Sequence, residues 1–231
     1  MPRPPLNIPA LYAGFNAPTT GFDCGQRCAP YNPRGVPFCC DICCAVPVVY
    51  QEEWEYLRPR TALWHPWRGD ECGCEPEDPS RLEADTPQHM RLLACLGVQA
   101  CQRDFRSITC RQFPFFPYIT EDDRFIGLAY HWDFEPTCWL ISHLGSVTSQ
   151  FRAEFVQTYD QLLLDCPEDY DSYYYLSEEM RADFIRARRR IPLLHRAGGF
   201  FLLSPRSGRL HPANPDKYRR FGPYRLSAPQ E

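Results

Sequence analysis

The stretch VPFCCDICCAV, residues 36–46, carries two adjacent pairs of cysteines, at positions 39–40 and 43–44. It ends a longer segment, residues 24–44, in which six cysteines are interspersed with prolines and glycines. Proline and glycine interrupt regular secondary structure, so this segment needs a bound ligand or a cross-link to fix its shape. Three explanations compete for the clustered thiols: disulfide bonds, a structural zinc ion, or an iron–sulfur cluster.

The composition favours the two metal explanations. The chain of 231 residues contains 13 cysteines, an odd number, and has a formal charge of −4. No apolar stretch reaches the roughly 20 residues of a membrane span, and the proline-interrupted start, residues 1–18, is not typical of a secretory signal. We therefore expect a cytoplasmic protein with reduced thiols, because disulfides are rare in the cytosol. The net charge predicts neither nucleic-acid binding nor binding to an anionic membrane.

The spacing of the cysteines identifies candidate ligands. Cys40 and Cys43 form a C-x-x-C step, the common spacing for two ligands of one metal, and Cys44 directly adds a third thiol. Closely spaced cysteines on a turn converge at little cost in loop-closure entropy. A site that also closes a fold needs ligands from distant segments, and the cysteines at 95, 101 and 110 can supply them.

Two motifs resemble those of a known family. The C-x-x-C-C element at 40–44 precedes the hydrophobic and acidic stretch VVYQEEWEYL, residues 48–57, and CRQFPFFP, residues 110–117, resembles a C-R-x-F-P-F signature. These features are similar to the YkgJ-type cysteine-cluster family, described as zinc- or iron-chelating and related to the flagellin lysine-N-methylase proteins. The resemblance covers residues 22–118. It implies that cysteines of both elements bind one metal ion or cluster.

The chain departs from the family pattern at two places. Pro37 stands where the family has its first cysteine, so that ligand has to come from Cys39, Cys24 or Cys28. The spacing before the C-R-x-F-P-F signature is also shorter than in the family. The candidate metal ligands are Cys39, Cys40, Cys43, Cys44, Cys95, Cys101 and Cys110.

The ligand type narrows the choice of metal. Structural zinc sites usually show two well-separated C-x-x-C pairs, often with histidine, and need four ligands. Cysteine-only ligation with surplus thiols favours an iron–sulfur cluster, which takes four thiolates. We therefore expect an iron–sulfur cluster, with zinc as the alternative, and a redox, maturation or protein-modification role. The alternatives are a lysine N-methylase-like enzyme acting on a protein substrate, and a non-catalytic interaction module stapled by zinc. The residues name no catalytic group.

The predicted fold class is α+β, mostly helical and irregular, organised around the cysteine-ligated site with a small sheet. We expect a single domain over residues 1–231. An extended proline-rich arm covers 1–23, the cysteine-cluster region covers 24–118, and a part with helices and strands covers 119–231.

Periodicity and flanking residues predict the main elements. The expected helices cover residues 50–57, 87–96, 148–165 and 177–190, the last with Ser177 as its N-cap. The expected strands cover residues 45–49, 124–132 and 200–203. Cys72 and Cys74 fall in a proline-broken acidic segment, residues 58–86, which is typical of an insertion. Their thiols are either exposed or an accessory ligand pair.

Two basic features also need an assignment. Arg111, next to Cys110, either offsets the charge of a thiolate cluster or forms a salt bridge that locks the loop. The run RARRR, residues 186–190, follows acidic residues on the same predicted helix. We interpret it as a solvated helix end, where arginine suits the helix dipole. Cys138 and Cys166 are expected to be structural rather than metal ligands.

Overall fold

The computed structural model of the protein describes residues 5–72 and 79–226. These residues form two antiparallel sheets together with α-helices, so the predicted α+β class is confirmed. No helix in this described part of the chain is long and apolar enough to cross a membrane.

The chain divides into two compact units. The sheet unit comprises Gly14–Cys24 and Pro114–Glu231, with the first four residues, and the cysteine unit comprises Pro5–Ala13 and Gly25–Phe113. The sequence predicts one domain with an internal boundary after residue 118. In the structure the chain passes from one unit to the other after Ala13, Cys24 and Phe113.

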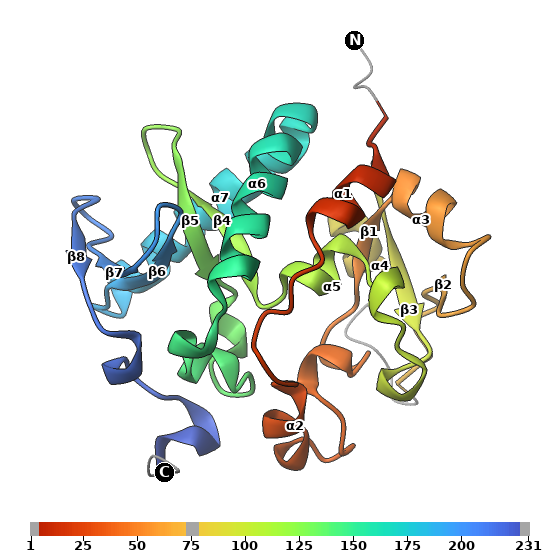
Figure 1. The fold of residues 1–231 in the computed structure, drawn as a ribbon, viewed down its shortest axis with the longest axis horizontal. Helices are drawn as coiled ribbons and strands as arrows, with labels where there is room; N and C mark the ends of the chain where they lie inside the picture. The colour runs from red at the N-terminus through yellow and green to blue at the C-terminus, as the bar shows by residue number, and fades with distance from the viewer. Residues whose placement is uncertain (1–4, 73–78, 227–231) are drawn as a thin grey trace. The chain divides into compact units, whose positions relative to one another are not determined.

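The sheet unit is built on five antiparallel strands that neighbour one another in chain order (Figure 1). They are β4 (Phe115–Ile119), β5 (Phe125–Tyr130), β6 (Ile191–His195), β7 (Phe200–Leu203) and β8 (Leu210–Pro212). Gly127 of β5 has a φ of 157°, and a Cβ at this position would collide with the carbonyl oxygen of Leu194 in β6. Glycine therefore allows these two strands to pair closely.

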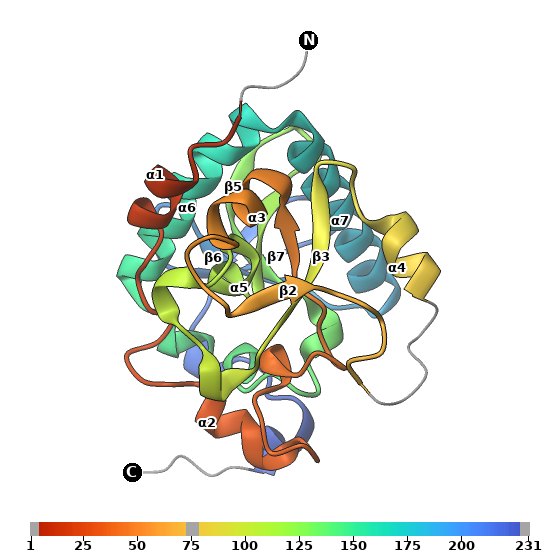
Figure 2. The same ribbon diagram turned by 90° about the vertical axis from the view of Figure 1, so that its right-hand side faces the viewer.

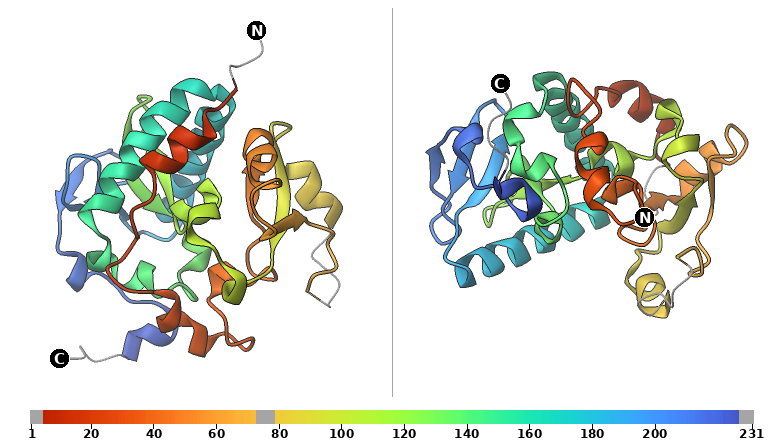
Figure 3. Two further views of the ribbon diagram at one scale, coloured as in Figure 1. Left: turned by 45° about the vertical axis from the view of Figure 1, so that its right-hand side comes forward. Right: turned by 90° about the horizontal axis from the view of Figure 1, so that it is seen from below.

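Two long helices cover opposite faces of this sheet (Figure 3). They are α6 (Ser149–Asp165) and α7 (Pro167–Arg186). Successive side chains of a strand point to opposite faces. Phe115 contacts Phe151 of α6, with ring centroids 5.9 Å apart, whereas Phe116 belongs to the apolar cluster that contains Phe184 of α7. Because both faces are covered, every residue of β4 is buried.

The signals for α6 are local, and the predicted helix is confirmed. Thr148 is the N-cap, and its hydroxyl accepts a hydrogen bond from the backbone N–H of Phe151 at 3.1 Å. The helix buries an apolar stripe that faces the sheet. The stripe consists of Phe151, Phe155, Tyr159 and Leu162. Phe15, from the segment before Cys24, packs against this stripe, with its ring centroid 5.5 Å from that of Phe151.

The helix α7 begins well before its predicted start at residue 177. Pro167 occupies its first turn, where a missing N–H does no harm, and acidic residues follow it. Ser177, predicted as the N-cap, lies inside the helix and is fully buried. Its hydroxyl donates to the carbonyl oxygen of Tyr173 at 2.7 Å and accepts from the backbone N–H of Ile119 at 3.0 Å. The serine thereby fastens α7 to β4 instead of starting the helix.

The cysteine unit holds a smaller antiparallel sheet in which β3 lies between β1 and β2 (Figure 2). Its strands are β1 (Val48–Tyr50), β2 (Trp64–Pro66) and β3 (Met90–Cys95). Its helices are α1 (Ile8–Gly14), α2 (Gly25–Cys28), α3 (Gln51–Leu57), α4 (Pro79–Asp85) and α5 (Ile108–Gln112). Val48 pairs with Leu92, and Trp64 pairs with Cys95, so the edge strands occupy different ends of β3.

Some predicted elements are confirmed and others are wrong. The helix over 50–57 and the strands over 124–132 and 200–203 are confirmed as α3, β5 and β7. Residues 87–96, predicted as a helix, form the strand β3, because the short apolar run MRLLAC pairs with a strand on each side. The arm over 1–23 is not extended throughout: it contains α1, which buries Ile8 and Tyr12.

Candidate metal centre

Four cysteines of the cysteine unit interact electrostatically with one another, although they come from well-separated positions in the chain. Cys40 ends a 3₁₀ turn, Cys95 ends β3, Cys101 follows a second 3₁₀ turn, and Cys110 lies in α5. We call these four residues the thiol group. Ser107 caps α5, and its hydroxyl accepts a hydrogen bond from the backbone N–H of Cys110 at 3.2 Å.

Burial disfavours the bare thiolates of Cys95 and Cys110. Burial, together with repulsion from Cys95 and Cys40, raises the pKa of Cys110 to about 12. Burial and repulsion from Cys40 and Cys101 likewise raise the pKa of Cys95. At neutral pH these thiols therefore keep their protons unless a cation takes the place of the protons.

A guanidinium group accompanies the thiols. Nε of Arg106 donates a hydrogen bond to Sγ of Cys101 at 3.1 Å, and Arg106 also interacts electrostatically with Cys40 and Cys110. Burial opposes the charge on this guanidinium, but its sulfur partners outweigh that effect and raise the pKa of Arg106. Arg106 thus supplies positive charge at a site with four potential thiolates.

Glu53 of α3 is fully buried and interacts with the same group. Its Oε1 accepts hydrogen bonds from the hydroxyl of Tyr12 at 2.8 Å and from the backbone N–H of Ile108 at 2.7 Å. Its Oε2 has no hydrogen-bond partner among the described residues. Burial raises the pKa of Glu53 to about 7, and the carboxylate in turn raises the pKa of Cys110. Glu53 therefore adds to the negative potential around the thiols whenever it is ionised.

Arg111 binds the backbone of the surrounding loop. Its guanidinium donates to the carbonyl oxygens of Arg106 and Asp104, both at 2.9 Å, and of Tyr12 at 3.3 Å. It also lies over the ring of Tyr12, 4.2 Å from the centroid. Arg111 thus holds the loop that precedes α5, and the hydrogen bond to a sulfur comes from Arg106.

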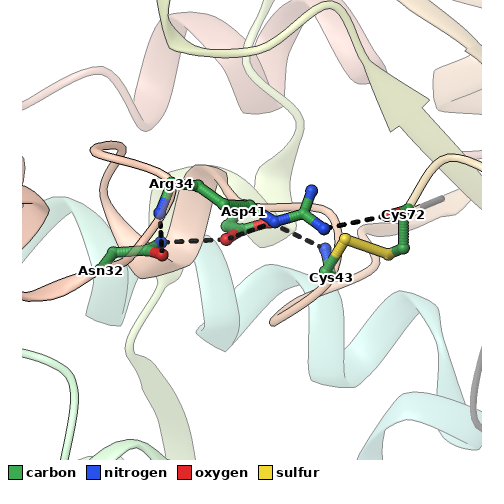
Figure 4. The surroundings of a disulfide bond; sticks show 5 residues. All are labelled: Asn32, Arg34, Asp41, Cys43 and Cys72. Carbon is green, nitrogen blue, oxygen red and sulfur yellow. Dashed lines mark hydrogen bonds and ion pairs between the residues drawn. A yellow bond between two sulfur atoms is a disulfide. The ribbon is translucent and has the colours of Figure 1, made fainter. Parts of the chain in front are cut away.

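Cys43 is bonded to Cys72 in a disulfide whose Cα atoms lie 5.4 Å apart (Figure 4). Nη2 of Arg34 donates to the carbonyl oxygen of Cys72 at 2.9 Å. The buried Asp41 accepts from the side-chain amide of Asn32 at 2.9 Å and from the backbone N–H of Cys43 at 3.1 Å. The sequence predicts reduced thiols and a metal-bound Cys43, and the bond departs from both expectations. The tertiary structure brings together two cysteines that lie 29 positions apart in the chain.

Two further predicted ligands flank this disulfide. The sulfur of Cys39 lies 4.0 Å from that of Cys40, at the edge of the thiol group. Cys44 is exposed, and burial of part of its side chain, followed by repulsion from Asp41, raises the pKa of its thiol. The VPFCCDICCAV stretch therefore divides: Cys40 belongs to the thiol group, Cys39 lies beside it, and the other two cysteines lie elsewhere.

The other cysteines have separate environments. Cys28 is buried, and its thiol donates to the carbonyl oxygen of Gly25 at 3.4 Å. Cys24 is half-buried and ends the first segment of the sheet unit. Cys166 is fully buried between α6 and α7. Cys74 lies outside the described residues.

The residues of the thiol group have the chemistry of ligands for a metal ion or an iron–sulfur cluster. Within residues 5–72 and 79–226, no three Cys, His, Asp or Glu side chains form a group that could hold a metal ion. The thiol group nevertheless supplies four sulfurs, the number that structural zinc or an iron–sulfur cluster takes. Arg106 can offset the charge of four thiolates, and the unpartnered Oε2 of Glu53 adds a buried acceptor nearby.

Sequence reasoning did not single out Arg106 or Glu53. Glu53 lies in the predicted acidic helix, but only tertiary packing distinguishes it from the half-buried Glu52 and the exposed Glu55. Comparison of the chain with protein-family models, with curated proteins and with solved structures found no match. The resemblance to the YkgJ-type family stays a prediction that rests on the quoted motifs.

Proposed function

We propose that the cysteine unit binds an iron–sulfur cluster or a metal ion through Cys40, Cys95, Cys101 and Cys110. The observation that supports this most is the electrostatic coupling of the four thiols to one another and to Arg106. Thiolates that interact in this way repel one another, and a bound cation removes the repulsion as it replaces their protons.

The proposed ligand set is narrower than the seven cysteines predicted from the sequence. It retains the three downstream cysteines and takes only Cys40 from the VPFCCDICCAV stretch. Cys39 is the reserve ligand, since its sulfur lies 4.0 Å from that of Cys40. Cys43 is engaged with Cys72, and Cys44 lies in a separate, exposed environment.

An iron–sulfur cluster is the favoured occupant and zinc is the alternative, because four thiolates satisfy either group. A cluster would supply one-electron redox chemistry, whereas zinc would act as a cross-link. Arg106 plays the same part in both cases, because it donates a hydrogen bond to the sulfur of Cys101 and offsets the charge of the ligand set.

Anaerobic purification followed by absorption spectroscopy and elemental analysis tests the proposal. A brown protein with a band near about 400 nm that dithionite bleaches supports the cluster, which absorbs through its thiolate–iron bonds. A colourless protein with one zinc per chain supports the alternative. A protein that retains neither iron nor zinc under these conditions contradicts the proposal.

Substitution separates the proposed ligands from the other cysteines. C95S and C110S should each abolish metal retention, whereas C44S, a change of the same chemistry at an exposed cysteine of the same unit, should leave it unchanged. C138S gives the matched control in the sheet unit. If C44S loses the metal and C95S keeps it, the ligand set proposed from the structure is wrong.

The two remaining alternatives from the sequence differ in their partners. A lysine N-methylase-like enzyme would transfer a methyl group from a labelled donor to a protein, and C110S should then lose this activity together with the metal. A zinc-stapled interaction module would hold zinc, show no transfer and capture a protein partner. The metal assay is therefore done first, because the two alternatives predict different combinations of metal content and methyl transfer.

A further inference from the structure

A basic corner of the sheet unit has no part in the proposed metal centre. The chain leaves the end of α7 through Arg188 and Arg189, and the turn between β7 and β8, residues 204–209, lies against this exit. A surface cavity of about 410 Å³ lies between the two segments. This volume is within the range of small-molecule sites.

Three of the eight lining residues of the cavity are arginines, and none of its described lining residues is acidic. Arg188 and Arg206 are exposed, and neither forms an ion pair with another residue in the described part of the chain. Arg189 is held in place: it forms an ion pair with Glu135 and lies over the ring of Phe184, 4.4 Å from the centroid. The cavity therefore has two uncompensated positive charges beside a third guanidinium with a fixed position.

The turn adds hydroxyl groups to these charges. Ser204 and Ser207 both line the cavity. The carbonyl oxygen of Ser204 accepts from the backbone N–H of Gly208 at 2.9 Å, which closes the turn. Neither serine hydroxyl has a hydrogen-bond partner among residues 5–72 and 79–226. Both hydroxyls thus remain available as donors to a ligand.

The backbone at Arg188 ends α7 in a Schellman motif. Its φ is 52°, a left-handed conformation that non-glycine residues rarely adopt. Backbone N–H groups maintain this geometry: that of Arg188 donates to Ile185 at 3.1 Å, and that of Arg189 donates to Phe184 at 2.8 Å. These two hydrogen bonds fix the backbone that carries Arg188 and Arg189 at the end of α7.

The same corner has a positive potential beyond the cavity. Desolvation, followed by repulsion from Arg190 and Arg209, lowers the pKa of His211 in β8. Arginines with fixed donor geometry and serine hydroxyls match the oxygens of a phosphate group, which accepts hydrogen bonds and carries negative charge. The neighbouring Ile185 and Pro205 offer apolar surface for the organic part of a ligand.

We propose that this cavity binds the phosphate monoester group of a small metabolite, with Arg188 and Arg206 as the charged ligands and Ser204 and Ser207 as hydroxyl donors. The solvated helix end predicted from RARRR thus becomes one wall of a binding site, because the fold adds Arg206 from a distant turn. The site lies in the sheet unit and does not depend on the proposed metal centre.

Titration of the full-length protein with inorganic phosphate and with phenyl phosphate, followed by amide NMR, tests the proposal. The shifts should concentrate at residues 187–189 and 204–208, and phenyl phosphate should bind more tightly because of its apolar group. Chloride at matched ionic strength should not reproduce them. If chloride produces the same shifts, or if no shifts localise to these segments, the proposal is overturned.

Substitutions identify the ligands. R188Q and R206Q should each weaken phenyl phosphate binding by about tenfold, the loss expected for one charge-assisted hydrogen bond. R206K should recover part of the affinity, because lysine restores the charge without the two-pronged geometry. The control R58Q/R81Q removes two exposed arginines from the cysteine unit and should leave the affinity unchanged. Equal binding by R188Q, R206Q and the control would overturn the assignment.

A single-stranded oligonucleotide serves as the third ligand. If it perturbs residues 187–189 and 204–208 while phenyl phosphate does not, the corner recognises nucleic acid and the small-metabolite proposal is wrong. Binding of phenyl phosphate that a short oligonucleotide cannot displace supports the proposal, because a site shaped for a monoester selects against an extended backbone.

Discussion

The two sheets of the protein are stabilised in different ways. All five residues of β4 in the sheet unit are buried, whereas only Leu93 and Ala94 are buried among the six residues of β3, the central strand of the cysteine unit. The sheet unit has long helices on both faces. The cysteine unit has edge strands of three residues each and long irregular connections. Apolar burial is therefore sufficient to stabilise the sheet unit, and we expect the stability of the cysteine unit to depend on cross-links among its thiols.

The sharpest test of this comparison is removal of the metal from the loaded protein. A structural metal in a small cysteine-rich unit contributes about 10–16 kcal/mol of apparent binding free energy, which is also folding free energy. Chelation under reducing conditions should therefore abolish amide protection in β3 and preserve it in β5. Hydrogen exchange followed by mass spectrometry measures both strands in one sample. Equal protection of β3 before and after chelation would show that its apolar core is sufficient.

Truncation of the apolar core should destabilise the sheet unit rather than the cysteine unit. Phe155 is fully buried in α6, between Phe15 and Tyr159, so F155A should lower the unfolding free energy of the sheet unit by about 3–5 kcal/mol. The metal content of the folded protein should stay the same. Denaturant unfolding followed by aromatic fluorescence measures the loss. L164A, at a position 78% exposed on the same helix, is the control and should change stability by less than about 0.5 kcal/mol.

The disulfide should contribute less than the metal to the stability of the cysteine unit. It closes a loop between residues 29 positions apart, for which restriction of the unfolded chain predicts about 2–4 kcal/mol. C72S should lower the stability of the oxidised protein by this amount. A reductant should lower the stability of the wild type equally and should not affect C72S. If the reductant destabilises both proteins to the same extent, another thiol pair carries the effect.

The smallest expected effect is the pH dependence that Glu53 contributes. Its pKa rises from 4.5 to about 7 on folding, so the folded state retains a proton that the unfolded state releases between these values. Stability should therefore fall as the pH rises from about 5 to 8, by up to about 3 kcal/mol in total. E53Q cannot ionise and should remove this part of the pH dependence. E55Q, at a position 56% exposed on the same helix, should keep it.

The helices of the sheet unit show how much local sequence can predict. The N-cap Thr148 and the stripe that contains Phe151 and Phe155 lie within two turns of each other, so their pattern is visible in the sequence. The predicted start of α7 is wrong because Ser177 resembles a cap, and its contact with Ile119 depends on a strand far away in the chain. The strand β3 is predicted as a helix because a run of six residues fits either element until its partners are known.

The sequence by itself determined that thiols cluster in the first half of the chain, that the class is α+β, and where the helix α6 lies. Only the tertiary structure decided which cysteines interact with one another, that Cys43 bonds to Cys72, and that Arg106 and Glu53 accompany the thiols. The physical reason is the range of the interactions. Helix patterns arise from contacts three or four residues apart, whereas the hydrogen bond between Glu53 and Ile108 spans 55 positions and forms only after the chain between them has folded.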